Sequence, residues 1–267
     1  MNQEERRRYL LEELLKEKRE YRKIAVPHGA QAQRELLRGL MNVRLPESCS
    51  DEFLRVQDAY LKQENEDKGI VDVDSLRPVQ PGIYLWQGDI TRLRCDAIVN
   101  AANSGMTGCY IPNHRCIDNC IHSYAGIELR LACDALMRQQ GHPEPTGWAK
   151  ITEAYNLPCR YVLHTVGPIV SGRLTEQDCH LLADCYRSCL SLAAEKGLES
   201  VAFCCISTGE FHFPNERAAE IAVSEVKKFL QTDSSVKKVI FNVFKDSDRE
   251  IYARLLTAGS AADQGEN

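Results

Sequence analysis

The sequence predicts an α/β fold, in which a largely parallel sheet is covered by helices and is preceded by a helical extension. From about residue 82 onward, strand-like and helix-like segments alternate, which is typical of parallel sheets. Most of the strand candidates are continuous apolar runs, as expected for strands covered on both faces. Before residue 70, apolar residues recur at helical spacing instead. We therefore predict a helical extension over residues 1–70 and an α/β domain over residues 71–267.

The N-terminal extension has the periodicity of amphipathic helices. Its leucines recur at helical spacing in two stretches, which comprise Leu10, Leu11, Leu14 and Leu15, then Leu36, Leu37 and Leu40. Ser50 and Asp51 are suitable N-terminal caps for a third helix, and the polar run at residues 63–69 indicates a boundary. Because the segment contains no residues that suggest chemistry, we interpret it as a packing extension.

The second part carries the predicted sheet. Strand candidates span residues 83–86, 97–101, 161–166, 201–206 and 239–244, and helix candidates lie near residues 118–140, 176–196, 215–231 and 247–257. Ligands of such folds bind outside the carboxyl ends of the strands. Three polar segments directly follow strand candidates, and they begin after Trp86, Ala101 and Ile206. We expect these three loops to meet at one rim of the sheet.

Composition narrows the class of protein. The chain has 267 residues, a net charge of −5, 43% hydrophobic residues and 27% charged residues, which is ordinary for a globular protein. The acidic balance argues against a nucleic-acid partner. No apolar run approaches the ~18 residues of a membrane span, and the charged N-terminus lacks the apolar core of a secretory signal. We expect a cytoplasmic protein with no membrane partner, whose twelve cysteines are reduced thiols.

One short segment places three zinc-ligand side chains close together. Cys109, His114 and Cys116 form the pattern Cys-x4-His-x-Cys. Cys120 and His122 follow, but they fall inside a predicted helix, so the pattern suggests three protein ligands and one open position, as in catalytic zinc sites. A chain with twelve cysteines also brings such residues together by chance, so the spacing alone leaves both interpretations open.

Three motifs together resemble the ADP-ribose-binding macrodomain family. They are QGDIT at residues 87–91, DAIVNAANS at residues 96–104 and ISTGEFHFP at residues 206–214, and the resemblance covers roughly residues 72–260. The Cys-x4-His-x-Cys insertion is similar to the zinc-dependent branch of that family, which acts as protein-ADP-ribose hydrolases. The resemblance implies a three-layer α/β/α macrodomain with a mixed, largely parallel central sheet and one Zn²⁺ held by Cys109, His114 and Cys116.

The resemblance also assigns roles to individual residues. It implies that the ligand ADP-ribose contacts Asp89, Ile90, Asn103, Cys116, Ile117, Asp118, Asn119, Ser207, Thr208, Gly209, Glu210 and Phe211. Asp89 would accept a hydrogen bond from the adenine amino group, and the backbone of Ile90 would support the ring. Asn103 would contact the distal ribose, and Asp118 would orient water or a ribose hydroxyl, so these two are the catalytic candidates. Taken singly, Asp89 also suits a turn, and Asp118 and Asn119 also suit helix caps.

The loop at residues 207–211 suits a diphosphate on physical grounds. Successive backbone N–H groups in a glycine-containing turn near a helix N-terminus bind anions without basic side chains. The family usually has glycine where His212 stands, which leaves the role of that side chain open. Glu210 either orients a ribose hydroxyl or faces water. Phe211 and Phe213 either wall the ligand or pack in the core, and we expect core packing for one of them.

The leading hypothesis is a zinc-dependent hydrolase that removes mono-ADP-ribose from acidic side chains of a modified protein and releases ADP-ribose. The metal would act as a Lewis acid or would activate a water. One alternative is an ADP-ribose-binding reader module with a structural zinc. Another is a hydrolase of small ADP-ribose esters. The resemblance further implies a mono-ADP-ribosylated partner protein of the lipoyl-carrier type.

Overall fold

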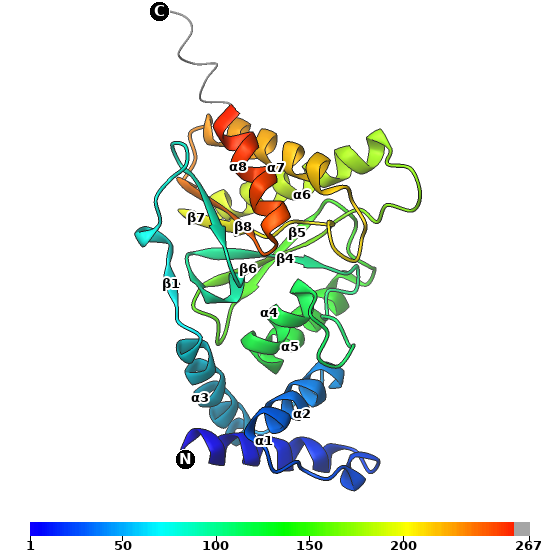
Figure 1. The fold of residues 1–267 in the computed structure, drawn as a ribbon. Coiled ribbons are helices and arrows are strands. Elements are labelled where there is room, and N and C mark those ends of the chain that lie inside the picture. The colour runs from blue at the N-terminus through cyan, green and yellow to red at the C-terminus, as the bar shows by residue number, and fades with distance from the viewer. Residues whose placement is uncertain (259–267) are drawn as a thin grey trace, which may run out of the picture.

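A six-stranded sheet forms the centre of the structure (Figure 1). The computed structural model describes residues 1–258, so the end of the predicted second domain, residues 259–267, lies outside the described residues. The strand order is β2–β8–β7–β4–β6–β5, and every neighbouring pair is parallel except β5 and β6. The strand bounds are β2 Ile83–Gln87, β4 Ala97–Ala102, β5 Ala149–Glu153, β6 Tyr161–Val166, β7 Ser200–Phe203 and β8 Lys238–Val243.

Helices cover both faces of this sheet. On one face lie α4 (Ile117–Ala125) and α5 (Ile127–Gln140), which contact β4 and β5. On the other face lie α6 (Glu176–Glu195), α7 (Asn215–Leu230) and α8 (Asp246–Ala258), as Figure 1 shows. The predicted three-layer fold with a mixed, largely parallel sheet is thereby confirmed.

Burial explains why the central strands read as apolar runs. β4, β6 and β8 are buried at all but one position each, whereas β2, at the edge of the sheet, is mostly half-buried. A short parallel ladder of β1 (Val71–Asp72) and β3 (Leu93–Arg94) lies outside the main sheet. Among the described residues, no helix combines the length and the apolar character that crossing a membrane requires.

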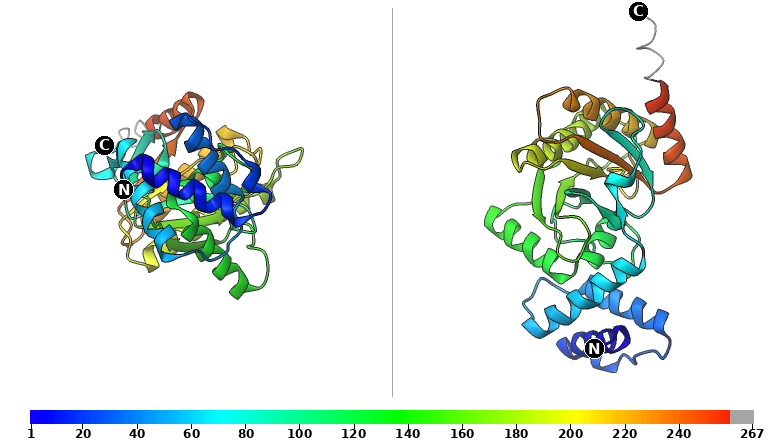
Figure 2. Two further views of the ribbon diagram at one scale, coloured as in Figure 1. Left: turned by 90° about the horizontal axis from the view of Figure 1, so that it is seen from below. Right: turned by 90° about the vertical axis from the view of Figure 1, so that its left-hand side faces the viewer.

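The N-terminal extension forms three helices, α1 (Gln3–Glu17), α2 (Ala30–Val43) and α3 (Asp51–Asp67). They lie on the outer side of α4 and α5, at the end of the molecule opposite α8 (Figures 1 and 2). The predicted leucines of α1 and α2 build a separate apolar cluster together with Phe53, Tyr60 and Leu61 of α3. The three helices therefore bury their apolar surface mainly against one another, and Ile127 of α5 joins the cluster from the α/β part.

The helix predicted over residues 118–140 is instead two helices that meet at Gly126. Gly126 has a φ of 102°, which a residue with a side chain rarely adopts. A Cβ there would lie 2.8 Å from Nε2 of Gln57 in α3. The side chain of Gln57 also accepts the Ile127 N–H at 2.9 Å, so the break lets α3 satisfy a backbone donor at the start of α5.

Two strands also differ from the prediction. The strand predicted over residues 201–206 ends at Phe203, because the chain turns so that the Thr208 N–H donates to the Cys205 carbonyl at 3.4 Å. β5 was not among the predicted strands. It pairs antiparallel at the edge of the sheet and is mostly half-buried, so its sequence Ala-Lys-Ile-Thr-Glu lacks the apolar run of a central strand.

Candidate functional site

The three motif loops follow strands at one rim of the sheet. β2 leads into Gly88 and Asp89, β4 leads into Asn103, and the segment after β7 leads into residues 207–213. Because β2, β8, β7 and β4 are parallel, their carboxyl ends lie on the same side. A direct contact joins two of these regions, since Nε2 of His114 lies 3.6 Å from Oε1 of Glu210.

Asp89 caps the short helix Ile90–Arg92, and one of its carboxylate oxygens is hydrogen-bonded to that helix. Its Oδ1 accepts the backbone N–H of Thr91 at 3.0 Å and the Thr91 hydroxyl at 2.7 Å. Within the described residues, the second carboxylate oxygen makes no hydrogen bond, and it remains available to an outside donor. The side chain of Ile90 is buried at 1% exposure, so only the backbone of this residue can face a ligand.

A buried carboxylate stands between two amides at the end of β4. Oδ1 of Asp118 accepts a hydrogen bond from Asn100 at 2.8 Å, and its Oδ2 accepts one from Asn103 at 3.3 Å. Burial raises the pKa of Asp118 to about 6, and the amide of Asn100, the charge of Arg130 and the amide of Asn103 oppose that rise. The two catalytic candidates are therefore direct neighbours. The sequence analysis did not identify the contact between Asn100 and Asp118, which joins a strand to a helix.

Asn103 also organises the turn in which it lies. Its Oδ1 accepts the N–H of Gly105 at 2.9 Å, and its amide donates to the carbonyl of Gly108 at 3.1 Å. These bonds are typical of an asparagine turn. The same amide group that reaches Asp118 is thus fixed by the loop that follows β4.

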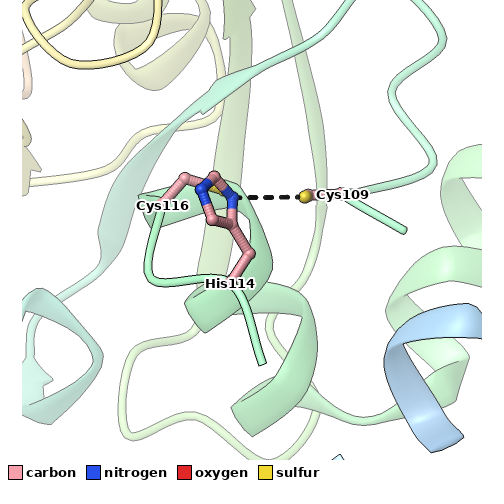
Figure 3. Close-up of side chains that lie close together, drawn as sticks. All are labelled: Cys109, His114 and Cys116. Carbon is pink, nitrogen blue, oxygen red and sulfur yellow. Dashed lines mark hydrogen bonds between the residues drawn. The ribbon is translucent and has the colours of Figure 1, made fainter. Parts of the chain in front are cut away.

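Cys109, His114 and Cys116 come together, and their potential ligand atoms all lie within 4.8 Å of one another (Figure 3). Sγ of Cys109 is 3.5 Å from Nδ1 of His114. A tetrahedral zinc with its usual bond lengths separates a sulfur and a nitrogen ligand by about 3.6 Å. The other ring nitrogen of His114 faces Glu210, and metal-bound histidines commonly have such a carboxylate partner. The donor set therefore fits a zinc ion with one open position.

Cys116 has a second role, because it caps α4. Its Sγ accepts the backbone N–H of Asn119 at 3.4 Å. Asp118 and Asn119, which the sequence suggested as caps, instead lie in the first turn of the helix. Burial raises the pKa of the Cys116 thiol to about 12, and the Asn119 N–H opposes that rise. A cation at this position would favour the thiolate.

The side-chain amide of Asn119 stabilises the loop that carries Cys109 and His114. Its Nδ2 donates to the carbonyl of Ile111 at 2.9 Å and to the carbonyl of Cys109 at 3.3 Å. The residue is fully buried. Neither its backbone N–H nor its side-chain amide is therefore free to bind a ligand in this conformation.

A second group of titratable side chains, His122, Cys133 and His164, lies buried behind Asp118. Burial lowers the pKa of His164 to about 3 and that of His122 well below its usual range, so both rings are neutral. The Asn100 amide donates to Nδ1 of His164 at 3.2 Å, which places the ring proton on Nε2, 2.9 Å from the Thr152 hydroxyl. His164 thus supports Asn100 and has no free nitrogen for a metal.

The loop at residues 207–213 presents backbone donors to open space. Ser207 and His212 have φ values of 64° and 57°, so the chain bends tightly at both ends of the loop. Within the described residues, the N–H groups of Gly209, Glu210 and Phe211 donate to no other group, and nothing lies within 4 Å of a Cβ built on Gly209. Three free successive donors before α7 are suited to an anion. Binding of a diphosphate by this loop stays a prediction.

The two phenylalanines of this loop have different surroundings. Phe213 is buried at 1% exposure and belongs to the main core, whereas Phe211 is half-buried and can line a ligand. The loop also packs closely on the end of β6, because a Cβ on Gly167 would lie only 2.0 Å from Oγ of Ser207. The expectation that one phenylalanine belongs to the core matches this arrangement.

Sequence comparisons give the same family. The family model described as Macro domain matches residues 99–222. A protein-ADP-ribose hydrolase of Treponema medium is 55% identical over 261 residues, which cover 96% of this chain and 100% of that protein. A protein-ADP-ribose hydrolase of Staphylococcus aureus (strain MSSA476) is 48% identical, with 91% of this chain and 92% of that protein covered.

Solved structures agree with the sequence matches. The Trypanosoma brucei macrodomain in complex with ADP-ribose superposes with a TM-score of 0.64 at 32% identity, covering 79% of this chain and 93% of that chain. The Oceanobacillus iheyensis macrodomain with ADP gives a TM-score of 0.62 at 34% identity, covering 70% of this chain and 96% of that chain. From the fold, the three rim loops and these matches, we conclude that the chain belongs to the macrodomain family.

Proposed function

We propose that the protein is a zinc-dependent hydrolase that releases ADP-ribose from mono-ADP-ribosylated acidic side chains of a partner protein. Relatives that match nearly end to end are named protein-ADP-ribose hydrolase, and a similar macrodomain was solved with ADP-ribose. The observation that carries the proposal is that the Asp118–Asn103 pair and the Cys109, His114 and Cys116 cluster lie together in one segment, which runs from the end of β4 to the first turn of α4.

Each of the three loops would bind a different part of ADP-ribose. The free oxygen of Asp89 would accept a hydrogen bond from the adenine amino group. The amides of Gly209, Glu210 and Phe211 would hold the diphosphate, which suits a chain without a net positive charge. The distal ribose would then lie near Asn103, whose amide contacts both Asp118 and the carbonyl of Gly108, the residue before Cys109. Anchoring the ligand at both ends would fix the scissile bond beside Asp118.

Asp118 would handle the proton in the reaction. With its pKa raised towards neutrality by burial, its carboxylate can accept a proton from water or from a ribose hydroxyl near pH 7. Asn100 and Asn103 would hold the carboxylate in place, and His164 would hold Asn100. Cys109, His114 and Cys116 would hold the zinc, which supplies Lewis-acid character and lowers the pKa of bound water when it is present.

A panel of linkages tests the proposal. Proteins mono-ADP-ribosylated on Asp or Glu, on Ser and on Arg are incubated with the enzyme, and free ADP-ribose is quantified by mass spectrometry. A modified lipoyl-carrier-like protein, which only the resemblance suggests as the target, joins the first group. The proposal predicts release from the Asp/Glu-linked proteins and little from the others. Binding of ADP-ribose without release from any protein would favour a reader module, and release from small ADP-ribose esters alone would shift the substrate class.

A further inference from the structure

We propose that the N-terminal helical extension positions the metal-ligand cluster, with Arg38 and Asn42 of α2 as the positioning residues. The inference rests on the proposed zinc site and goes beyond it, because it assigns a function to helices that the sequence marked only as packing. The segment of residues 106–116, here called the metal loop, contains no helix or strand. Its shape must therefore come from contacts with its surroundings.

Arg38 reaches out of the extension and into the metal loop. Its Nη2 donates to the backbone carbonyl of His114 at 2.7 Å and to Oδ1 of Asn119 at 2.9 Å, and its Nε donates to the Ser123 hydroxyl at 3.3 Å. These are charge-assisted bonds from one planar group to acceptors on two elements. Arg38 thus fixes the backbone of a ligand residue directly.

Asn42, one helical turn later, holds the neighbouring residue of the loop. Its Oδ1 accepts the backbone N–H of Asn113 at 2.9 Å, and its amide donates to Ser123 at 2.8 Å. Asn113 has a φ of 55°, a left-handed conformation that needs support from outside. Gly39 lies between the two positioning residues, and its missing side chain allows the close approach, since a Cβ there would lie 3.2 Å from Nδ2 of Asn113.

Asn119 links Arg38 to the two cysteines through hydrogen bonds. Arg38 fixes the oxygen of its side-chain amide, and the nitrogen of that amide then donates to the carbonyl of Cys109 at 3.3 Å. The backbone N–H of Asn119 donates to the sulfur of Cys116. Each of the three ligand residues is therefore tied to α2, His114 by one hydrogen bond and the two cysteines through Asn119.

Arg130 of α5 ties the start of the loop to the same helix. It donates to the carbonyl of Thr107 at 2.7 Å, and to the carbonyls of Asn42 at 2.8 Å and of Met41 at 3.1 Å. The ring of Tyr110 stacks on its guanidinium at 4.3 Å. The extension is thus part of the shell around the cluster, and such outer partners orient ligands and tune metal affinity.

Zinc affinity of full-length variants tests this inference. Arg38→Met keeps the length of the side chain but removes its donors, and Asn42→Ala removes the acceptor for Asn113. Arg34→Met is the matched control, because Arg34 lies one turn earlier on α2 and, among the described residues, pairs only with Glu64 of the extension, at 3.3 Å. Affinity is measured by competition with a chromophoric chelator, and the Co²⁺-loaded proteins are compared by their visible absorption spectra.

We expect Arg38→Met and Asn42→Ala to weaken zinc binding about 10- to 100-fold and to alter the cobalt spectrum. Arg34→Met should leave both unchanged. Arg38→Lys keeps the charge but not the planar guanidinium, and it serves as a second variant in case Arg38→Met does not fold. Its zinc affinity should lie between those of wild type and Arg38→Met. Wild-type affinity and spectrum in folded Arg38 and Asn42 variants would overturn the positioning role alone. A wild-type protein that binds no zinc would overturn the proposed metal site itself.

Discussion

His114 and Glu210, which come from different loops, face one another with Nε2 and Oε1 3.6 Å apart. This contact connects the metal-ligand cluster with the loop whose free amides can hold a diphosphate. The carboxylate lies at the ring nitrogen opposite the Cys109 sulfur, so in the proposed zinc site it would orient the imidazole for a metal on the other side. A ligand held by the free amides of this loop would therefore lie next to Cys109, His114 and Cys116.

Glu210→Gln should weaken zinc binding, but by no more than about tenfold, because the Glu210 side chain is 69% exposed and solvent screens its charge. Chelator competition measures the effect. Glu216→Gln on α7, which removes an exposed carboxylate paired with Arg254, is the control and should leave zinc affinity unchanged. Equal zinc affinity in both variants would show that Glu210 only faces water.

Asp118→Asn should lower turnover about 10²- to 10⁴-fold, because the amide cannot accept a proton while the shape of the side chain is kept. ADP-ribose affinity, measured by calorimetry, should change far less, since the adenine and diphosphate contacts lie on other loops. Single-turnover release of ADP-ribose separates chemistry from binding. Undiminished turnover in this variant would remove Asp118 from the chemistry.

Gly167→Ala should destabilise the protein by about 1–3 kcal/mol and weaken ADP-ribose binding, because the new methyl group would overlap Oγ of Ser207 and displace the diphosphate loop. Adding Ser207→Gly removes that oxygen and fits the positive φ of the position, so the double variant should regain part of the loss. Thermal unfolding and calorimetry measure the two effects. A double variant no better than Gly167→Ala alone would locate the strain elsewhere.

Stability should depend on pH through Glu128, which lies on α5 where the extension docks. Burial and the nearby Asp58 of α3 raise the pKa of Glu128 from 4.5 to about 7. The folded state therefore holds this proton more tightly than the unfolded chain, and stability falls as the pH rises from about 4.5 to about 7. Glu128→Gln should raise the melting temperature at pH 8 and leave it nearly unchanged at pH 4.5. The exposed Glu153→Gln is the control, and equal melting temperatures of Glu128→Gln and wild type at pH 8 would contradict the assignment.

Local sequence patterns were sufficient to predict much of the fold. Continuous apolar runs located β4, β6 and β8 within one or two residues, because burial on both faces leaves a strong signal. The break at Gly126 was missed because it depends on Gln57, which reaches it from a distant helix. β5 was missed because an edge strand needs no apolar run.

For the candidate site too, the sequence predicted the local motifs but not the contacts between distant residues. The residues of the rim loops are contiguous motifs, so their approximate place followed from the strands that precede them. The partners of those residues are not local: Asn100 and Asp118 meet from a strand and a helix, and Arg38 lies 76 residues before His114 in the chain. Nothing in the amphipathic pattern of α2 distinguishes Arg38, which contacts the metal loop, from Arg34, which does not.

The most direct test of the proposed function is release of ADP-ribose from an Asp- or Glu-linked protein by metal-loaded, chelated and zinc-restored enzyme. Circular dichroism of each sample verifies that the fold is retained. The proposal predicts that turnover disappears on chelation and returns with zinc while the spectrum stays constant. Undiminished turnover by the folded, chelated enzyme would contradict a catalytic zinc and would leave the chemistry to Asp118 and Asn103.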